Sequence, residues 1–429
     1  MRIVDHHTIV TMLEFNSKIS HFTNLLRKFI AYSGPALIVS IAYMDPGNYG
    51  TDLQGGAAFG YSLLWVVWLS SAIAMLVQYL SGKLGIATER SLAEILREKL
   101  GRKLFIIPYW LSAEVAAAAT DLAEYLGTVI ALNLLFGVPM IYAAIFGAAD
   151  VVIILALTSR RFRLLEQLFL LFVSIISFGY AYEMLMAPPD FHRILSGSFS
   201  PHFANSSALF VAVGIIGATV MPHVVFLHSF LTKEKATGKT LEERRKMRKL
   251  HLAETIFLLT IAALVNAAIL LMAAVAFYPN NSQIASIAEA YKTLVPLFGI
   301  SAGVVFVITL LSSGIASSAA GTIAGQVIME GFLGKKVNIW LRRIVTRFVN
   351  VIPTTIAILL GFDPLHILVY SQFILSLMIP IATIPVVMLT MSKKLMGEFV
   401  NRKITTIVAI VFVGIVLVFN VLSLVSQSS

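Results

Sequence analysis

The sequence predicts an all-α protein that crosses a membrane many times. Of its 429 residues, 58% are hydrophobic and only 13% are charged, which is far from the composition of a soluble domain. The apolar residues gather into eleven stretches of about 20 residues or more, the length that an α-helix needs to cross a bilayer. The first and sixth stretches are interrupted by proline beside polar residues. These observations favour a polytopic membrane protein with 11 transmembrane helices and a functional site at the two interruptions.

The expected spans follow one another with short connections. In order, they cover residues 34–60, 61–83, 104–132, 138–158, 163–187, 207–231, 250–278, 296–325, 341–361, 363–391 and 404–425. Residues 1–33 lack the basic start, the compact apolar stretch and the small-residue cleavage site of a signal peptide. We therefore expect them to form a retained N-terminal tail.

Lys and Arg are distributed unevenly between the two sides of this predicted bundle. The chain has 32 of them, and the loops on the side away from the N-terminus contain only Arg193 and Lys292. Because positively charged loops stay in the cytoplasm, we expect a cytoplasmic N-terminus and an extracellular C-terminus in the cell membrane. We attribute the net charge of +10 to inner loops such as residues 232–249, which face anionic lipid. Nucleic-acid binding is not expected.

The two interruptions occupy matching positions in two halves of the chain. Spans one to five cover residues 34–187, and spans six to ten cover residues 207–391. The first span of each half carries the break, at residues 45–48 and 219–223. Five is an odd number, so the halves must have opposite orientations in the membrane. Paired interruptions of this kind are typical of inverted-repeat transporters that bind their substrate near the middle of the bilayer.

Each proline releases a backbone carbonyl from its helical hydrogen bond. Pro46 cannot donate to the carbonyl of Ala42, and Pro222 cannot donate to that of Ala218. An unpaired carbonyl is costly in hydrocarbon, so it must meet water, protein or a cation. Both breaks are therefore candidate cation sites, although a single proline kink in a membrane helix is usually structural.

Side chains that can hold a cation lie at both breaks. Asp45 and Asn48 offer oxygens at the first, and Met221 offers a thioether at the second. Oxygens alone would suit Mg²⁺ or Ca²⁺, whereas a thioether favours more polarisable transition metals. The chain has no cysteine, which argues against a tight structural zinc site. These donors predict a site for Mn²⁺ or Fe²⁺; the alternative for Met221 is a methionine that fills a gap in the core.

The third span carries three acidic residues on one stripe. Glu114, Asp121 and Glu124 fall within roughly 80° of one another when the chain turns about 100° per residue. Since acids cannot face lipid, they must meet cations, water or each other, and Arg342 and Arg343 of the ninth span are the expected partners. The stripe is either a set of structural ion pairs or a proton route, because desolvated acids can take up and release protons.

His223 follows Met221 by two residues and therefore lies next to the candidate site. It can relay a proton from Asp45 towards the third span, or it can be a neutral, hydrogen-bonded core histidine. Asp45 is a suitable first proton acceptor, because it must be ionised to bind metal. Asp52, seven residues after Asp45 and on a similar face, fits a pore-lining or capping role as well as a ligand role.

Several motifs occur in order along the chain. They are "DPGN" in span one, "ATDLAEYLGTVIAL" in span three, "MPH" in span six, "SSAAGTIAGQVIMEGFL" in span eight, "LRRIVTRF" entering span nine and "SQFILS" in span ten. Together they resemble the Nramp family (natural resistance-associated macrophage proteins), which are proton-coupled divalent metal transporters. The resemblance implies a LeuT-type fold with 5+5 inverted repeats plus one extra C-terminal helix.

The resemblance also implies which residues hold the metal. These are Asp45, Asn48, Ala218 and Met221, joined in some states by Gln372 of "SQFILS" and by the carbonyl of Ala42. The acidic stripe would then carry protons to the cytoplasm. The sequence departs from the family at Val224, where asparagine is frequent, and at Ile315 and Ala316, where a polar pair is usual. Because the magnesium and aluminium branches lack the methionine, Met221 favours the manganese and iron branch.

These features predict a secondary transporter that imports Mn²⁺ or Fe²⁺ with protons by alternating access. We expect no cofactor, and a monomer is compatible with the sequence. No G-x-x-x-x-G-K-[ST] motif is present, so ATP is not expected to drive the chain. One alternative is a sodium-coupled amino-acid symporter of the same fold, which an aspartate beside a thioether suits poorly. The other is an intramembrane metalloenzyme, for which His223 and His228 lack the H-E-x-x-H spacing.

Overall fold

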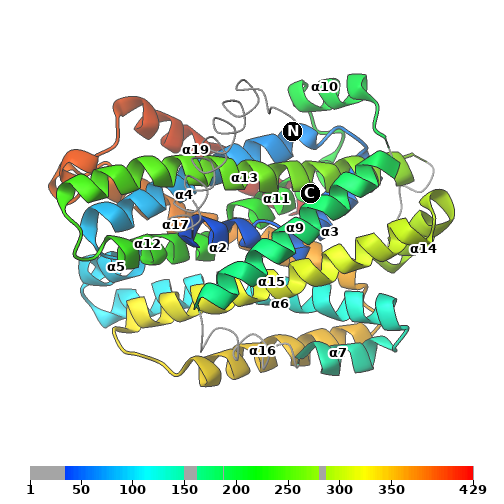
Figure 1. The fold of residues 1–429 in the computed structure, drawn as a ribbon, viewed down its shortest axis with the longest axis horizontal. Helices are drawn as coiled ribbons and strands as arrows, with labels where there is room; N and C mark the ends of the chain where they lie inside the picture. The colour runs from blue at the N-terminus through cyan, green and yellow to red at the C-terminus, as the bar shows by residue number, and fades with distance from the viewer. Residues whose placement is uncertain (1–33, 149–161, 187, 280–286, 429) are drawn as a thin grey trace, which may run out of the picture.

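The computed structural model describes residues 34–148, 162–186, 188–279 and 287–428, and all their regular secondary structure is helical (Figure 1). The helices before residue 200 are α2 (Gly34–Ala42), α3 (Pro46–Phe59), α4 (Leu64–Thr88), α5 (Leu92–Leu100), α6 (Lys103–Phe136), α7 (Met140–Ala148), α9 (Phe162–Met186) and α10 (Phe191–Phe199). Those that follow are α11 (Ser206–Val220), α12 (Pro222–Ala236), α13 (Leu241–Phe277), α14 (Ile287–Phe298), α15 (Ile300–Leu333), α16 (Ile339–Leu359), α17 (Pro364–Thr390), α18 (Lys393–Met396), the 3₁₀ turn η1 (Gly397–Phe399) and α19 (Lys403–Ser428).

Within the described residues, eight helices are long and apolar enough to cross a membrane, when α11 and α12 count as one. The predicted number of eleven is not reached, for three local reasons. The break divides the first span into α2 and α3, each too short alone. α16 carries three arginines within 21 residues. The fourth predicted span, 138–158, runs past Ala148 into residues outside the described part of the chain, where the predicted tail 1–33 also lies.

The two interrupted helices lie in the interior of the bundle (Figure 1). α3 packs against α11, α13 and α17, and α11 also packs against α4. Nearly all of the apolar stretch of α11 and α12 is buried, as expected for a helix that is hydrophobic on all sides. The interruptions are therefore enclosed by protein, which is the condition under which irregular backbone is tolerated at membrane depth.

α16 shows how the bundle meets lipid. Its side chains Arg343 and Arg347 are buried, whereas Leu341, Val345 and Phe348 are exposed, and the helix packs against α6 and α7. This is the reverse of an amphipathic helix in a soluble protein. An exposed apolar face with charges turned inward is what a helix in hydrocarbon requires.

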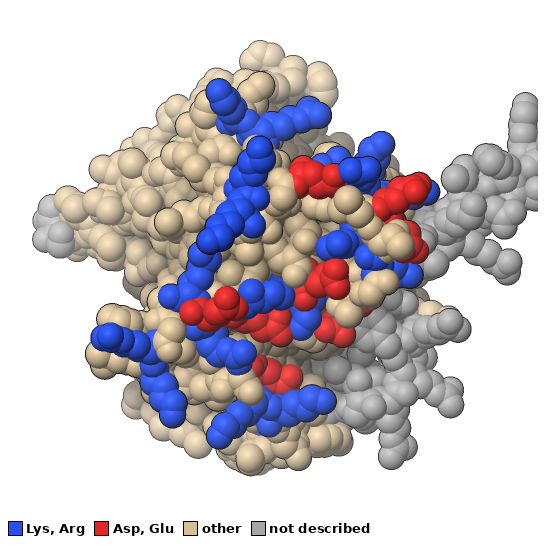
Figure 2. All heavy atoms as spheres, turned by 90° about the vertical axis from the view of Figure 1, so that its left-hand side faces the viewer, with Lys and Arg blue, Asp and Glu red and all other residues tan. Residues whose placement is uncertain are grey.

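Charged side chains gather at one end of the bundle, which Figure 2 shows face on. This charged end contains α5, α18, the last turn of α12 and the first turns of α13. Ion pairs join these elements: Lys233 Nζ lies 2.7 Å from Glu94 Oε1, and Arg244 Nη1 lies 3.0 Å from Glu89 Oε1. The basic segments expected on one side of the membrane thus meet at one end. That this end faces the cytoplasm stays a prediction.

The Glu94 carboxylate of the charged end binds both Lys233 and the backbone of Ser91. Partial burial raises its pKa, but the hydrogen bond from Lys233 and that from the backbone N–H of Ser91 hold the pKa below its ordinary value. The bond to Ser91 belongs to a capping box at the start of α5.

Candidate metal site

Asp45 shapes the first interruption. Its Oδ1 accepts a hydrogen bond of 2.8 Å from the backbone N–H of Asn48, so the carboxylate caps α3. Pro46 takes the first helical position, where a missing N–H does no harm. Asp45 is 1% exposed, and its Oδ2 has no hydrogen-bond partner among the described residues. The carboxylate is therefore fixed in place with one oxygen free to bind a cation.

Met221 is the single residue between α11 and α12. Its backbone is left-handed, with φ 43° and ψ 86°, a conformation that costs a residue with a Cβ about 1–2 kcal/mol. Strain of this kind concentrates at functional sites. Pro222 follows at once and cannot donate to the carbonyl of Ala218. The second interruption thus leaves the Ala218 carbonyl without its helical hydrogen bond, next to a fully buried methionine.

The two interruptions meet at the side-chain amide of Asn48. Its Nδ2 donates to Asp45 Oδ1 at 2.8 Å, to the Ala218 carbonyl at 3.1 Å and to the Tyr43 carbonyl at 3.3 Å. Its Oδ1 accepts from the Thr219 hydroxyl at 3.0 Å. Three oxygens therefore converge on one donor nitrogen, which occupies the place that a cation would favour. For a cation to bind there, the amide must turn so that its oxygen faces the ion.

Gln372 of α17 lies beside Asp45 across Gly47. A Cβ on Gly47 would lie 2.5 Å from Gln372 Nε2 and 2.8 Å from Asp45 Oδ2, so only glycine leaves room for both groups. Gln372 is fully buried, and its Oε1, like Asp45 Oδ2, has no partner among the described residues. An unsatisfied buried acceptor costs about 1–3 kcal/mol. A bound cation would satisfy both acceptors, so the residues fit a metal ion.

The six predicted ligands all lie at the interruptions or beside them. Asp45, Asn48 and Ala218 are joined by hydrogen bonds, Gln372 flanks Gly47, Met221 forms the α11–α12 junction, and Ala42 ends α2. They offer carboxylate, amide, carbonyl and thioether donors. The described residues contain no group of three or more His, Asp or Glu that could hold a metal. The candidate site therefore depends on neutral donors arranged around one carboxylate.

Sequence reasoning missed three residues around the site. Thr219 donates to Asn48, Tyr43 supplies a carbonyl, and Asn266 of α13 donates to that same carbonyl at 3.3 Å. Asn266 could have been found, because it is a lone amide in an otherwise apolar span and such residues are functional candidates by default. No local sequence feature indicates that the carbonyl of Tyr43 lies at the site.

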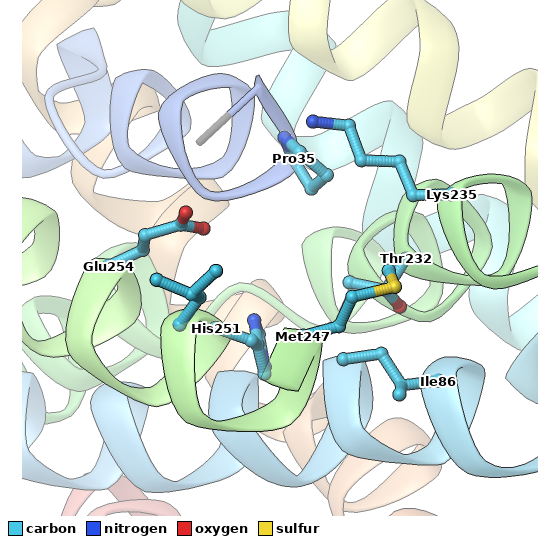
Figure 3. Close-up of a pocket in the computed structure, with 8 residues that line it drawn as sticks. Pro35, Ile86, Thr232, Lys235, Met247, His251 and Glu254 are labelled. Atoms are coloured by element: carbon cyan, nitrogen blue, oxygen red, sulfur yellow. The ribbon is translucent and has the colours of Figure 1, made fainter. Parts of the chain in front are cut away.

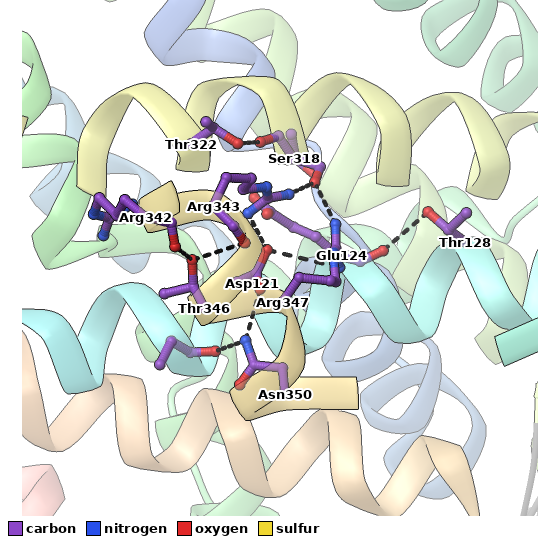
Figure 4. A network of polar contacts seen from close by, with 12 residues as sticks. Asp121, Glu124, Thr128, Ser318, Thr322, Arg342, Arg343, Thr346, Arg347 and Asn350 are labelled. Carbon is purple, nitrogen blue, oxygen red and sulfur yellow. Dashed lines mark hydrogen bonds and ion pairs between the residues drawn. The ribbon is translucent and has the colours of Figure 1, made fainter. Parts of the chain in front are cut away.

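Asp121 of α6 is the centre of a buried polar cluster (Figure 4). It pairs with Arg343, lies 3.7 Å from Nη1 of Arg347, and accepts from Asn350 Nδ2 at 2.7 Å. Both arginines also donate to the hydroxyl of Ser318 on α15. The acid of the third span and the arginines of the ninth are thus together, as expected from the need to keep charges out of lipid.

The other two acids of the stripe differ in their partners. Glu114 Oε2 accepts from Arg342 Nη2 at 2.8 Å, and the Glu114 side chain is 15% exposed. Glu124 is buried against Gly321 of α15, and its Oε2 has no hydrogen-bond partner among the described residues. Within the described chain, the stripe therefore combines ion pairs with one acid that forms none.

His223 lies between the metal site and the acidic stripe. Its Nδ1 is 3.2 Å from the hydroxyl of Thr120, the residue that precedes Asp121. Its Nε2 has no partner within the described ranges. This is the place that a proton relay requires, and the same contact also satisfies a neutral core histidine.

A further row of polar side chains leads from the site to the charged end. Gln78 donates to the Tyr43 hydroxyl at 2.8 Å and lies 2.9 Å from His228 Nδ1, and the rings of His228 and His251 are 4.8 Å apart. His251 and Glu254 border a small hollow of about 20 Å³ at the start of α2 (Figure 3). This hollow contains none of the proposed ligands and is therefore not the metal site.

A larger hollow lies beside the C-terminal part of α3. Its volume is about 550 Å³, and Gln54, Ala58 and Phe59 line it together with residues of α11, α17 and α19. It adjoins the helices that carry the ligands, so it is a suitable approach for an ion on the side opposite the charged end.

The sequence matches the family described as "Natural resistance-associated macrophage protein-like" over residues 36–426, a range that contains all the proposed ligands. The chain belongs to the Nramp family. The divalent metal cation transporter MntH of Deinococcus radiodurans is 42% identical to it over 396 residues, which are 92% of this chain and 89% of that protein. MntH of Yersinia pestis is 42% identical over 405 residues, which are 94% and 96% of the two chains.

Solved structures agree with this Nramp assignment. The Eremococcus coleocola manganese transporter, crystallised with an aromatic bis-isothiourea substituted compound, has a TM-score of 0.84 and 32% identity, covering 94% of this chain and 87% of that one. Mhp1, a nucleobase-cation-symport-1 family transporter, has a TM-score of 0.55 and 12% identity over 92% of each chain, which shows a shared fold alone. These matches support the predicted LeuT-type fold of a multi-pass membrane protein. Since the family consists of metal transporters, the metalloenzyme alternative is excluded.

Proposed function

We propose that this Nramp protein imports a divalent transition metal, Mn²⁺ or Fe²⁺, together with protons by alternating access. The observation that supports it most is the convergence of oxygens from both interrupted helices on Asn48 Nδ2. The relatives named as divalent metal cation transporters and as a manganese transporter point to the same cargo. Because the ligands come from two halves of the chain, a relative movement of the halves would assemble or open the site.

The donors assign separate tasks to the ligands. Asp45 provides the anionic oxygen and must lose its proton before a metal binds. Proton release and metal binding are therefore coupled at this carboxylate. Met221 would discriminate against Ca²⁺ and Mg²⁺, because these hard ions gain little from a thioether. His223 and Thr120 lie between the site and Asp121, and they would pass the released proton towards the acidic stripe.

The amino-acid symporter is disfavoured by the first interruption. Such a transporter binds the carboxylate of its substrate at the free N-terminus of a broken helix. Here the N-terminus of α3 is already capped by Asp45. A second carboxylate at that place would be repelled by the first.

Uptake into proteoliposomes tests the proposal. Mn²⁺ influx should require the protein, rise with an acidic outside and an inside-negative potential, and bring protons with it. Fe²⁺ should compete, whereas Ca²⁺ and Mg²⁺ in excess should not. Mn²⁺ influx that is indifferent to the proton gradient and brings in no protons would contradict the coupling, and the absence of Mn²⁺ influx would contradict the cargo.

A further inference from the structure

A hollow at the charged end is lined by basic side chains and contains none of the proposed metal ligands. Its volume is about 220 Å³, and α5, α12 and the end of α15 border it. The basic residues on its wall are Arg97 of α5 and the neighbours Lys335 and Lys336, which follow α15. None of the three forms an ion pair or a side-chain hydrogen bond within the described residues. This basic hollow therefore presents three positive charges that no described side chain neutralises.

The two acids that line the basic hollow are already bound by protein donors. Glu94 Oε1 accepts from Lys233 Nζ at 2.7 Å. Glu330 Oε1 accepts from the side-chain amide of Gln326 at 2.6 Å and from the backbone N–H of Val337 at 3.1 Å. Since Lys233 neutralises Glu94, the three free cations face one remaining acid. The hollow therefore has a net positive charge, which attracts anions.

Arg97 is held against the C-terminal end of α15. Gly334 ends that helix with φ 70°, and a Cβ on it would overlap Nη1 of Arg97. Three residues earlier, a Cβ on Gly331 would lie 2.5 Å from that of Ala93 on α5. Glycines thus let α5 and α15 approach closely, and this approach places the guanidinium at the hollow.

The connection that carries the two lysines is tied back to α15. The carbonyl of Val337 accepts from Gln326 Nε2 at 2.6 Å, and its N–H donates to Glu330. Lys335 and Lys336 therefore lie between the end of α15 and a residue that two side chains of α15 hold. The positions of all three cations follow from the packing of helices and not from a free loop.

The basic hollow lies beside the apolar surface that meets lipid. Leu333, directly before Gly334, and Trp340, in the first turn of α16, are each 39% exposed. Leu341 is 62% exposed and begins the exposed apolar face of α16. Tryptophan is enriched where a membrane meets water. An anion in the hollow would therefore have charged protein on one side and apolar surface on the other.

We propose that the basic hollow binds the phosphate group of an anionic phospholipid, with Arg97, Lys335 and Lys336 as its ligands. A planar guanidinium donates two parallel hydrogen bonds to phosphate, and each lysine adds a point charge. Basic pockets between membrane helices bind lipid headgroups in this way. A soluble phosphate would use the same cations, but only a lipid also uses the apolar surface at Leu333 and Trp340. The site requires no metal and does not depend on the proposed transport.

Binding of phosphatidylglycerol to the purified full-length protein in detergent tests the site. The unfolding temperature should rise as phosphatidylglycerol is added, and phosphatidylcholine with the same acyl chains should not raise it, because its headgroup has no net charge. Lys335→Gln/Lys336→Gln should bind phosphatidylglycerol about 25-fold more weakly, at about fivefold for each charge removed. Adding Arg97→Gln should weaken binding by about a further fivefold. Without lipid, these variants should unfold like the wild type, because the substituted side chains have no described partner.

Lys393→Gln/Lys394→Gln is the matched control. It removes two adjacent lysines of α18, at the same charged end, which also form no ion pair within the described chain and do not line the basic hollow. Its affinity for phosphatidylglycerol should stay within about twofold of the wild type, since distant sites contribute nearly independently.

Three outcomes would overturn the lipid site. An equal loss of affinity in the two double-lysine variants would mean that the lipid responds to the overall charge and not to the hollow. Equal stabilisation by phosphatidylcholine would show that the phosphatidylglycerol charge is not recognised. Equal stabilisation by soluble glycerol phosphate at the same concentration would show that the occupant is a free phosphate and not a lipid.

Discussion

The side-chain amide of Asn48 donates a hydrogen bond of 3.1 Å to the carbonyl of Ala218, although 170 residues separate them. The carbonyl is the one released by Pro222, and the amide belongs to the helix that begins at Pro46. Each proline therefore creates half of a site that exists only when the two halves of the chain pack together. Substitutions at the site and in the clusters around it should separate the contribution of each group.

Asp45→Ala should abolish Mn²⁺ uptake. The substitution removes the only carboxylate among the proposed ligands, and the loss of Mn²⁺ affinity should exceed the 10–100-fold typical of second-shell changes. Binding is measured by titration calorimetry and uptake in proteoliposomes. Asp52→Asn, which changes a buried carboxyl group two turns further along α3, serves as the control, and its Mn²⁺ affinity should equal that of the wild type. Near-normal uptake by the Asp45→Ala protein would disprove the site.

Gly47→Ala should prevent metal binding, whereas Gly50→Ala should not. A Cβ at residue 47 would lie 2.5 Å from the Gln372 amide and 2.8 Å from Asp45 Oδ2, so one of these groups must move. The nearest neighbours of a Cβ at residue 50 would be Leu365 and Leu368, at 3.4 Å or more, and replacing glycine inside a helix should stabilise α3 by about 0.5–1 kcal/mol. Equal Mn²⁺ affinity in the two variants would contradict the proposed crowding at Gly47.

Met221→Ala should keep part of the Mn²⁺ uptake while admitting Ca²⁺, because the thioether is lost and the oxygens remain. Met221→Gly should show the same selectivity and yet be more stable than Met221→Ala by about 1 kcal/mol, since glycine adopts the left-handed backbone without strain. Competition uptake and unfolding in detergent measure the two effects. Continued exclusion of Ca²⁺ would show that the thioether is not the selective group.

Asp121→Ala should destabilise the protein more than Glu114→Ala. Asp121 neutralises buried Arg343 beside Arg347, and breaking such a pair costs about 3–5 kcal/mol because a charge stays buried. The Glu114 side chain is 15% exposed, so water can replace part of its contact with Arg342, and a smaller cost than that of Asp121→Ala is expected. Thermal unfolding in detergent compares the variants. Similar losses in both would mean that the cluster around Asp121 is solvated.

Glu94→Gln should weaken the charged end only above acidic pH. The pKa of Glu94 is lower in the folded protein than its ordinary value. Its ion pair with Lys233 therefore contributes stability above the unfolded pKa of about 4.3, and the contribution disappears as the pH falls through the folded pKa. Glutamine preserves the capping box with Ser91, so only the charge is tested. At pH 7 the variant should be less stable by up to about 1 kcal/mol, and this difference should vanish near pH 3. Unfolding in detergent at the two pH values measures it, and an equal difference at both would contradict the ion pair.

Much of the site could be read from single residues. Pro46 and Pro222 mark the helix breaks because proline lacks an N–H wherever it occurs, and Asp45 is conspicuous because an acid is costly at that depth. Gln372 was named only through resemblance to a family, since a glutamine in an apolar span does not by itself reveal which ion it faces. The approach of its amide to Asp45 depends on Gly47, which sequence reasoning assigned to no contact.

The sequence by itself determined that the chain is a helical membrane protein, where two helices break, and which donor atoms are available, because these follow from the local chemistry of each residue. Only the tertiary structure decided that Asn48 reaches Ala218, that Asp121 rather than Glu124 meets Arg343, and that Gln372 lies beside Asp45 across Gly47. Helical periodicity gives the face of a helix on which a residue lies. It does not give the height or rotation of one helix against another, and those are set by the packing of the whole bundle.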